Sequence, residues 1–462
     1  MLPELENNKN VVMRLAPFPS GPLHIGNARP YIINDEYVKK YKGKLFLVMD
    51  DTIGSVDKPV VKEAYGLIEE GLKWLKIKYD KVFYKSDRLE IYYKYAEEII
   101  KKGYAYVCFC SSDILRKNRE DGISCGCRMK DVEENLKEWK NMFKYKEGKA
   151  TLRIKTDMKH PNPAFRDRVI FRISDREHPR VKKKYRIWPL LDFSWAIDDH
   201  LLGITHVIRG KELMMESDME NYIWDIFGWK KAIILHTGLL QLEGVKISKS
   251  KSRQEVESGK YKGWDDPRTW SLQSLERRGF NPDAIREFII EFGINENEVT
   301  VPVDVLYSKN KKYAEKGKRF FFVDNPKKII IKDAPNLDVE IKMHPSLDLG
   351  VRKIKTGKEF YIQDELIKGN AYRLMHLLNF KDKKFVSKEY DKTLNVKPIH
   401  WVNAKDCVKI EVLMDDATVL NGVAESGIVN LKINDLIQAE RRFFCRFDAV
   451  DNGVYKFWFT HK

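Results

Sequence analysis

Cysteine is scarce in this sequence, and long apolar runs are missing from it. Six cysteines in 462 residues do not make the disulfide framework of a small secreted domain. No apolar run approaches the roughly 20 residues that a membrane-spanning helix needs. The chain starts Met1-Leu2-Pro3-Glu4, without the basic and apolar segments that typify a secretory leader. We therefore expect a soluble, cytoplasmic protein with no membrane partner.

Acidic residues are outnumbered by basic ones. The chain has 84 Lys and Arg against 68 Asp and Glu, which gives a formal net charge of +16. A basic surplus of this size favours a polyanionic partner, with nucleic acid ahead of membrane. The alternative is a solvated lysine-rich surface, and charge alone does not separate the two. The length predicts two to four domains.

The N-terminal part alternates strands and helices. Val11–Leu15 is a short apolar strand, a loop rich in proline and glycine follows, and residues 26–41 have a helical pattern. Leu45–Met49 is a second buried strand, and this order begins a parallel α/β sheet. The pattern changes at residues 104–187, which we interpret as an insertion, and the alternation resumes afterwards.

The C-terminal part has a different character. Residues 265–294 have a helical pattern, and beyond Val301 short strands alternate with turns. Strands of this kind without intervening helices predict one or two all-β barrels. We therefore expect the chain to change fold class near residue 301.

One loop lies between the first strand and the first helix and reads Pro-Ser-Gly-Pro-Leu-His-Ile-Gly-Asn at residues 19–27. Ligands of open α/β sheets bind at this place, and a helix N-terminus binds phosphate through its free N–H groups. Gly21 and Gly26 let the backbone approach a nucleotide closely, and His24 can donate a hydrogen bond to phosphate. The alternative is an ordinary loop in which the histidine is incidental.

A second loop reads Lys-Ile-Ser-Lys-Ser-Lys at residues 246–251. Small residues that alternate with lysines make a mobile cationic loop, which can close over a triphosphate and stabilise charge on it. A solvated basic turn is the alternative. Because the two loops start and end one split α/β domain, the pair is far more specific than either loop alone.

The two loops resemble the HIGH and KMSKS signatures of class I aminoacyl-tRNA synthetases, written here HIGN and KISKS. Further segments resemble the glutamyl/glutaminyl subgroup: RLAP at 14–17, DDT at 50–52, NPAFRD at 162–167, DDHLLGITHVIRG at 198–210 and GWDDPRTW at 263–270. The β-rich C-terminal third resembles the archaeal and eukaryotic branch. The resemblance covers the chain from about Val11 to its end.

The resemblance implies the α/β fold class, with a Rossmann-type parallel-sheet catalytic domain, an α/β insertion, a helical connector and C-terminal all-β barrels. The first half of the catalytic domain would span residues 10–103, and the insertion, which binds the tRNA acceptor end, residues 104–187. The second half, with the KISKS loop, would span residues 188–255. The helical connector would span residues 256–304, and the anticodon-binding barrel region residues 305–462.

The resemblance assigns ATP binding to the two loops. His24 and Lys249 would be the catalytic residues, because they and a Mg²⁺ ion stabilise the charge that builds on the phosphates. The residues that bind ATP would be His24, Gly26, Asn27, Lys246, Ser248 and Lys249.

The resemblance also defines an amino-acid pocket. Arg14, at the end of the first strand, would bind the side-chain carboxylate of glutamate, since a guanidinium fork recognises a carboxylate bidentately. Asp50 would hold the α-ammonium group, and Arg209 would be a second pocket arginine. A surface ion-pair set at the rim of the sheet is the alternative. The pocket residues would be Arg14, Ala16, Asp50, Leu191 and Arg209.

The implied function is that of a glutamate–tRNA ligase, which activates glutamate with ATP and transfers it to the 3′-terminal adenosine of tRNA(Glu). Three pocket positions depart from the family pattern, because Phe18, Leu191 and Trp195 are bulkier or more apolar than the usual residues. The alternatives are a related ligase that charges glutamine or another amino acid, and a tRNA-binding paralogue that charges nothing.

Four cysteines of the predicted insertion form two Cys-x-Cys pairs, with 14 residues between the pairs. Four thiolates could hold a tetrahedral structural Zn²⁺, and some glutamyl synthetases carry zinc at a related place. Free reduced cysteines are the alternative, since the spacing within each pair is tighter than the common Cys-x-x-Cys. The candidate ligands are Cys108, Cys110, Cys125 and Cys127.

Two further groups of residues suit contact with tRNA. The basic run at residues 180–184 would contact phosphates of the acceptor end. Aromatic residues of the C-terminal strands could stack on unpaired anticodon bases, although core packing is the favoured interpretation. These aromatic residues are Phe443, Phe444, Tyr455 and Trp458.

Overall fold

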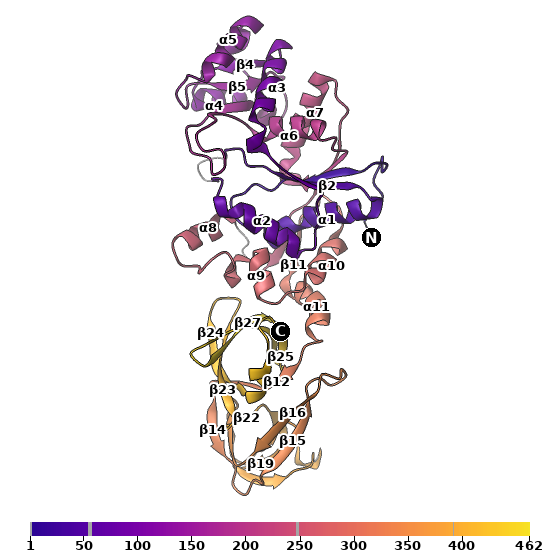
Figure 1. The fold of residues 1–462 in the computed structure, drawn as a ribbon, viewed down its shortest axis with the longest axis vertical. Coiled ribbons are helices and arrows are strands. Elements are labelled where there is room, and N and C mark those ends of the chain that lie inside the picture. The colour runs from indigo at the N-terminus through magenta and orange to yellow at the C-terminus, as the bar shows by residue number, and fades with distance from the viewer. Residues whose placement is uncertain (1, 54–57, 246–248, 391) are drawn as a thin grey trace. The chain divides into compact units, whose positions relative to one another are not determined.

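The computed structural model describes residues 2–53, 58–245, 249–390 and 392–462, and Figure 1 shows its fold. The chain divides into two compact units. The first comprises residues 1–255 and 289–301, and the second comprises residues 256–288 and 302–462. Among the described residues, no helix has both the length and the apolarity to cross a membrane.

A parallel sheet forms the centre of the first unit. Thr205 donates its backbone N–H to the carbonyl of Val12 at 2.9 Å, which joins one group of three parallel strands to another group of two. Buried apolar residues run along three of these strands, β1, β2 and β8, as is typical of parallel sheets. The α/β class predicted from the sequence is confirmed. The strands are β1 (Val12–Leu15), β2 (Lys44–Met49), β3 (Lys81–Tyr84), β8 (His206–Gly210) and β9 (Ile233–Thr237).

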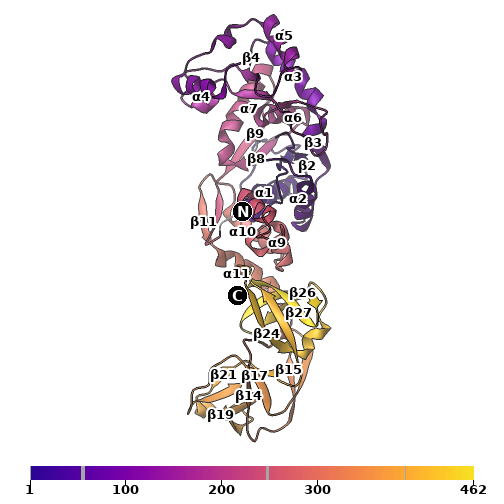
Figure 2. The ribbon, with the colours of Figure 1, turned by 90° about the vertical axis from the view of Figure 1, so that its left-hand side faces the viewer.

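Helices connect the strands of this sheet. In α2, the buried residues Ala64, Ile68 and Leu72 recur at helical spacing and form its apolar face. Helix α7 (Met214–Phe227) ends before Gly228, whose left-handed backbone (φ 69°) suits glycine best. Figure 2 shows α6 and α7 close to β8 and β9. The helices are α1 (Ile25–Tyr41), α2 (Lys62–Trp74), α3 (Leu89–Lys101), α6 (Leu191–Leu201) and α7 (Met214–Phe227).

An antiparallel sheet interrupts the parallel one, where the sequence predicted an insertion. Its four strands pair in chain order, and Trp139 and Phe171 pack edge to face in its core, with ring centroids 5.1 Å apart. Asp131 caps a helix here, since its carboxylate accepts the N–H of Glu134 at 2.8 Å. The elements are β4 (Ala105–Cys108), α4 (Ser112–Asp121), α5 (Val132–Met142), β5 (Thr151–Ile154), β6 (Val169–Ile173) and β7 (Ile187–Pro189).

Short helices follow the parallel sheet, as the sequence predicted. The helical connector implied for residues 256–304 also contains a strand, β11 (Val299–Pro302), which lies in a two-stranded sheet with β10 (Leu240–Glu243). The helices are α8 (Lys249–Glu257), α9 (Leu272–Arg277), α10 (Pro282–Phe292) and α11 (Val303–Ala314).

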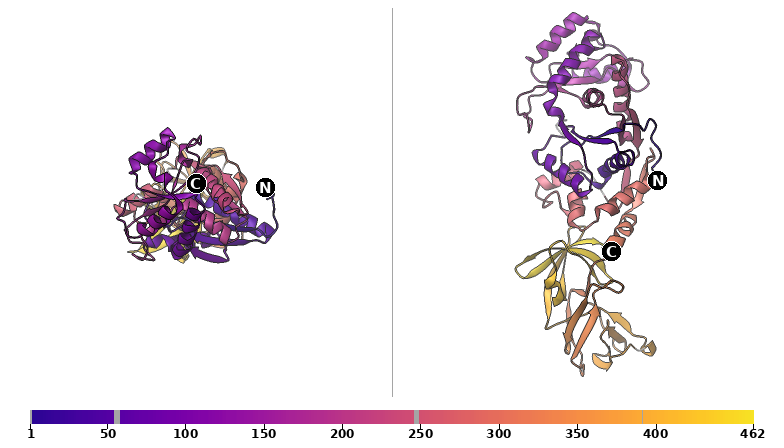
Figure 3. Two further views of the ribbon diagram at one scale, coloured as in Figure 1. Left: turned by 90° about the horizontal axis from the view of Figure 1, so that it is seen from above. Right: turned by 45° about the vertical axis from the view of Figure 1, so that its right-hand side comes forward.

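The largest sheet of the second unit has seven strands. Figure 3 shows the C-terminal strands in orange and yellow. The edge strands of this sheet are β12 and β13, which one residue, Phe321, separates in the chain, so the two edges meet and the sheet closes like a barrel. The C-terminal β-rich region predicted from the sequence is confirmed. In the order of the sheet, the strands are β12 (Arg319–Phe320), β25 (Leu436–Ala439), β26 (Phe443–Asp451), β27 (Val454–His461), β23 (Cys407–Leu413), β24 (Val419–Glu425) and β13 (Phe322–Asp324).

Smaller sheets complete the second unit around their own apolar core, in which Trp401 is fully buried and Phe360 packs against it. Phe443, Phe444 and Trp458 are buried in the seven-stranded sheet, so the favoured interpretation of these three aromatic residues as core is confirmed. Tyr455 is half-buried and packs against the core of this sheet. The remaining strands are β14 (Lys327–Ile330), β15 (Leu337–Lys342), β16 (Val351–Thr356), β17 (Glu359–Ile362), β18 (Ala371–Leu374), β19 (Leu378–Lys381), β20 (Lys384–Ser387), β21 (Lys397–Ile399) and β22 (Val402–Asn403).

Candidate functional site

A cavity of about 580 Å³ lies at the carboxyl edge of the parallel sheet. Its wall comes from the ends of β1, β8 and β9, from the first turn of α1 and from β10. Open α/β sheets bind their ligands at this edge. The predicted site residues that line the cavity are Arg14, Ala16, His24, Gly26, Asn27 and Arg209.

Other predicted site residues are not in the lining. Asp50 pairs with a buried lysine at 3.1 Å, and Leu191 is the half-buried first residue of α6. Lys246 and Ser248 lie outside the described residues. The same holds for the side chain of Lys249, whose backbone begins α8.

The HIGN turn starts helix α1. His24 is the N-cap residue, with an extended backbone (φ −121°, ψ 170°), and its carbonyl accepts the N–H of Asn27 at 2.9 Å. The helix has 17 residues, and the positive end of its dipole attracts anions. At Gly26 a Cβ atom would come within 3.1 Å of the His24 ring, so glycine leaves room for the imidazole at the start of the helix.

Arg14 holds a buried carboxylate. Its Nε and Nη2 donate to Asp199 at 2.6 and 2.9 Å, and both side chains are buried. Burial by itself would lower the pKa of Arg14, but the charge and hydrogen bonds of Asp199 outweigh it and raise this pKa. The guanidinium therefore carries its charge inside the protein.

Arg209 repeats this arrangement from the end of β8. Its Nη1 and Nη2 donate to the two carboxylate oxygens of Glu220 at 2.7 and 2.8 Å. Burial raises the pKa of Glu220, and the charge and hydrogen bonds of Arg209 oppose that shift. The two predicted pocket arginines thus lie at one edge of the sheet, each bound to an acid of the chain itself.

Lys85 is a site residue that the sequence analysis missed. It follows β3 directly and is fully buried, and its ammonium group pairs with Asp50 at 3.1 Å and donates to the hydroxyl of Ser194 at 2.9 Å. Burial lowers its pKa. Asp50 therefore interacts with a cation of the chain, and the sequence signal for Lys85 is its position at the end of a strand.

Arg29 is a second residue that the sequence analysis missed. It lies in α1, lines the cavity and is buried. Its Nη1 donates to the carbonyl of Gly238 at 2.6 Å, and its Nη2 donates to that of Gly293 at 3.1 Å. These bonds tie α1 to the segment between β9 and β10 and to the residue that follows Phe292.

The three departures from the family pattern lie in different places. Trp195 lines the cavity and is buried. Phe18 and Leu191 are half-buried and are not in the lining. Of the three positions, Trp195 therefore has the most direct effect on the shape of the pocket.

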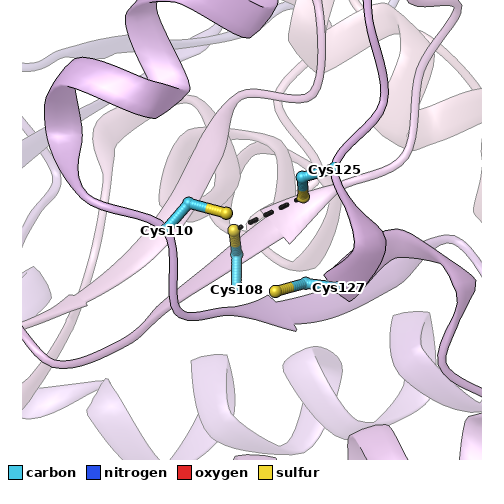
Figure 4. Close-up of side chains that lie close together, drawn as sticks. All are labelled: Cys108, Cys110, Cys125 and Cys127. Carbon is cyan, nitrogen blue, oxygen red and sulfur yellow. Dashed lines mark hydrogen bonds between the residues drawn. The ribbon is translucent and has the colours of Figure 1, made fainter.

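The four cysteines of the insertion converge. Their sulfur atoms all lie within 4.8 Å of one another (Figure 4), and those of Cys108 and Cys125 are 3.8 Å apart. Four thiolates around a tetrahedral zinc at about 2.3 Å would lie about 3.8 Å from one another. Two of the cysteines are buried and two are half-buried. The donor set fits a structural zinc site.

Other side chains surround the cysteine cluster. Arg153 is buried, and its Nη1 donates to the sulfurs of Cys108 and Cys125, each at 3.7 Å. Its Nε donates to the carbonyl of Asp167 at 2.7 Å. Burial raises the pKa of Cys108. A cation bound by the four sulfurs would counter that shift, because thiolates and not thiols ligate zinc.

The parallel sheet, the helix that starts at His24 and the cavity between them define a class I aminoacyl-tRNA synthetase. The chain belongs to the class I tRNA synthetases of the E and Q type. The family model "tRNA synthetases class I (E and Q), catalytic domain" matches residues 10–315. The model "tRNA synthetases class I (E and Q), anti-codon binding domain" matches residues 317–399.

Curated relatives match nearly the whole chain. Glutamate–tRNA ligase of Methanococcus maripaludis strain S2 is 41% identical over 473 residues, which cover 99% of this chain and 85% of the relative. The ligase of Methanocaldococcus jannaschii gives the same identity and the same coverage. That of Pyrococcus furiosus is 43% identical over 483 residues, which cover 100% of this chain and 84% of the relative.

Solved structures resemble the chain more distantly. The crystal structure of a glutamate tRNA ligase from Elizabethkingia meningosepticum in complex with its amino acid is 19% identical. The match covers 67% of this chain and 70% of that one, with a TM-score of 0.48. This likeness is too weak to bear on the site.

Proposed function

We propose that the protein is a glutamate–tRNA ligase, which forms glutamyl-adenylate from glutamate and ATP and transfers the glutamyl group to tRNA(Glu). The observation that carries the proposal is the cavity itself, which has the His24 turn at one wall and two arginines at strand ends at another. The identity of 41% to archaeal glutamate–tRNA ligases over 99% of the chain supports it. We expect it to act in the cytoplasm, where tRNA is charged.

Binding and positioning do most of the work in this reaction. The α-carboxylate of glutamate attacks the α-phosphorus of ATP, and pyrophosphate leaves. His24 and Lys249 stabilise the charge that develops on the phosphates. Mg²⁺, bound with ATP, neutralises phosphate charge. The terminal ribose hydroxyl of tRNA then attacks the mixed anhydride, so the protein needs no nucleophile of its own.

The amino acid is held on the other side of the cavity. Arg14 and Arg209 provide N–H donors and positive charge for the side-chain carboxylate of glutamate. The bonds of Arg14 to Asp199 use Nε and Nη2, which leaves Nη1 outside that pair. Asp50 attracts the α-ammonium group, together with the charges around it. The pocket is therefore built of fixed ion pairs that set the position of the substrate.

Other parts of the chain contact tRNA in this proposal. The insertion, residues 104–187, holds the acceptor end, and the barrel region, residues 305–462, reads the anticodon. The rest of the chain carries the chemistry and links the tRNA-binding parts in this proposal. It consists of the two catalytic halves, residues 10–103 and 188–255, and the helical connector, residues 256–304. The exposed lysines of the basic run at residues 180–184 suit phosphate contact.

A structural Zn²⁺ in the cysteine cluster is part of the proposal. Cys108, Cys110, Cys125 and Cys127 would hold it as four thiolates. The ion would tie the end of β4 to the loop before α5 and stabilise the insertion. The fit of the four sulfur positions to tetrahedral coordination supports this assignment.

The proposed function is tested by ATP–pyrophosphate exchange with tRNA present, screened across amino acids. Glutamate should give the highest rate. A response to glutamine or another amino acid without a response to glutamate would identify a related ligase. Salt-dependent tRNA binding without exchange for any amino acid would identify a paralogue that charges nothing.

The role of Lys249 gives a second test. Lys249→Ala should lower the rate of adenylate formation by about 100-fold, the usual effect of losing a donor that stabilises transition-state charge. ATP binding should weaken much less, because the contact strengthens in the transition state. Pre-steady-state adenylate formation and equilibrium ATP binding measure the two effects. Equal losses in both would mean that the loop provides uniform binding only.

A further inference from the structure

Three cationic side chains lie close to the ring of Trp195. This residue belongs to α6, lines the cavity and is 5% exposed. The guanidinium carbon of Arg209 lies 4.7 Å from the centroid of its ring, the ammonium of Lys85 5.0 Å and the guanidinium carbon of Arg14 5.2 Å. Cations at these distances are attracted to the indole ring. The ring therefore helps to fix the cations that come from the ends of β1 and β8 and from the residue after β3.

Each of these cations also has a carboxylate partner inside the protein. These three cations are therefore balanced pair by pair by carboxylates of the chain itself. Selection of a substrate then depends on individual hydrogen-bond donors more than on total charge. The pairs are Arg14 with Asp199, Lys85 with Asp50 and Arg209 with Glu220.

Two N–H donors at this wall find no acceptor among the described residues. They are the indole Nε1 of Trp195 and the Nε of Arg209, and both atoms are buried. Buried N–H groups in proteins are nearly always paired with protein or water, because an unpaired one is destabilising. Two such donors on neighbouring side chains that line a cavity indicate that a ligand supplies the acceptors.

We infer that Trp195 determines the amino-acid specificity of this pocket, because its indole N–H and the Nε–H of Arg209 receive the two oxygens of the substrate's side-chain carboxylate. Two donors favour a carboxylate, which offers two acceptor oxygens, over an amide, which offers one acceptor and an NH₂ group. The inference rests on the proposed function and deepens it. It assigns the discrimination between glutamate and glutamine to one of the three positions at which the sequence departs from the family pattern.

The substitution Trp195→Phe tests this assignment, since it keeps an aromatic ring and removes the N–H. The KM for glutamate should rise about 10- to 150-fold, the usual effect of one lost hydrogen bond to a charged group. The kcat should change little, because the side-chain carboxylate does not react. The preference for glutamate over glutamine in kcat/KM should fall by a similar factor. Trp195→Ala, which also removes the ring beside the cations, should lower kcat as well.

A matched control is Trp139→Phe, which makes the same change at a fully buried tryptophan in the core of the insertion. It should leave the glutamate KM and the preference over glutamine unchanged, and thermal melting of both variants would show that they fold. An unchanged KM and an unchanged preference in Trp195→Phe would overturn the inference while leaving the proposed function intact. A wild-type protein that does not activate glutamate would overturn both.

Discussion

The carboxyl edge of the sheet and the cysteine cluster both contain buried ionisable groups. Only at the sheet edge does each charged group pair with an opposite charge of the chain itself. At the sheet edge, Arg14 and Arg209 each make two hydrogen bonds to a buried carboxylate. In the cluster, four thiols converge, and Arg153 reaches two of them. Four thiolates would carry four negative charges, of which one guanidinium offsets one.

This difference separates a preformed site from one that needs a ligand to form. Buried charges persist in a fold when each has a partner with good geometry, so the sheet edge can take its shape before substrate arrives. Four thiolates repel one another until a cation binds among them, and binding of a structural metal is therefore coupled to folding. Removing one group should accordingly have different consequences in the two regions.

Among single substitutions in these regions, we expect the largest loss of stability at the cysteine cluster. Cys125→Ser should abolish stoichiometric zinc binding, because serine is a poor zinc ligand and three thiolates leave the tetrahedral set incomplete. The melting temperature should fall with the loss of the metal, and a chelator should lower that of the wild type to a similar value. Elemental analysis of the purified chain and thermal melting with and without chelator measure both.

Cys407→Ser is the matched control for this change. Cys407 is half-buried in β23 of the second unit and is not one of the four converging cysteines. This variant should keep its zinc and its response to chelator. A wild-type chain that is purified without metal and does not take up zinc would show that the cluster holds reduced cysteines, and the contrast with the sheet edge would then disappear.

The next largest effect concerns the balanced region. Asp199→Ala leaves the buried guanidinium of Arg14 without its partner and should destabilise the first unit by about 3–5 kcal/mol, as is usual when one side of a buried ion pair is removed. Urea unfolding followed by circular dichroism measures the change. It should exceed by far the effect of breaking an ion pair at the surface.

Asp225→Ala provides that comparison in the same unit. Asp225 pairs with Lys231 at 2.8 Å, and both side chains are largely exposed. Its loss should cost about 0–1 kcal/mol. If the two variants proved equally stable, the pair of Arg14 with Asp199 would contribute no more than a surface contact does, and the sheet edge could not be regarded as preformed.

A buried cluster in the second unit is intermediate in charge balance between the sheet edge and the cysteine cluster. In it, two carboxylates share one arginine. Arg352 donates to Glu425 at 2.5 Å and to Glu440 at 2.8 Å, and all three side chains are buried. Burial would raise the pKa of Glu440, but hydrogen bonds from His376 and Arg352 lower it to about 2. For Glu425, burial outweighs the same arginine and raises the pKa to about 7.

The lowered pKa of Glu440 predicts a loss of stability in acid. Its ordinary value is 4.5 and its folded value about 2, so the folded state binds the proton less readily than the unfolded state does. The stabilisation is complete above pH 4.5 and is lost as the pH falls toward 2, by about 3 kcal/mol in all. Urea unfolding of the wild type between pH 5 and pH 2.5 should show this loss, and Glu440→Gln should reduce it.

An acid at the surface of the same unit is the control. Glu340 is exposed in the hairpin of β15 and β16, and Glu340→Gln should leave the acid profile of the wild type unchanged. The same slope in all three proteins would show that Glu440 does not keep a lowered pKa. Sharing Arg352 between two carboxylates would then have no special effect on the dependence of stability on pH.

The sequence predicted the parts of these regions that depend on local order. The strand, loop and helix around His24 and the two Cys-x-Cys pairs lie in short segments, and turn chemistry and spacing are readable there. The alternation of apolar strands and helices sufficed for the α/β class. The shift to short strands beyond Val301 sufficed for the β-rich C-terminal region.

The partners of the buried charges were not predictable in the same way. Asp199 lies 185 residues from Arg14 in the sequence, and Ser194 lies 109 residues from Lys85. Such pairs form only when the order of strands in the sheet brings them together, and a single sequence does not give that order. The strand β8 also extends past its apolar residues Val207 and Ile208, so that Arg209 lies within the strand. Polar residues at the end of a strand extend it when they are paired, and the apolar pattern does not mark them.

The smallest effect is expected at the start of α1 and concerns space rather than charge. In Gly26→Ala, the new Cβ atom would lie 3.1 Å from the His24 ring, closer than ordinary contact, so the imidazole must move by a few tenths of an ångström. A displaced donor stabilises the phosphates less well, and kcat/KM for adenylate formation should fall about 10-fold, which corresponds to about 1.4 kcal/mol.

Gly66→Ala makes the same change in the middle of α2, where nothing lies within 4 Å of the added carbon. It should leave activity unchanged and raise the free energy of unfolding by about 0.5–1 kcal/mol, because alanine favours the helix. Gly26 is the second residue of α1, where the gain in helix propensity is smaller, so Gly26→Ala should lose activity with little change in stability. Wild-type kinetics in Gly26→Ala would mean that the imidazole of His24 can shift and still stabilise the phosphates. The start of α1 would then be less rigid than the ion pairs beside it.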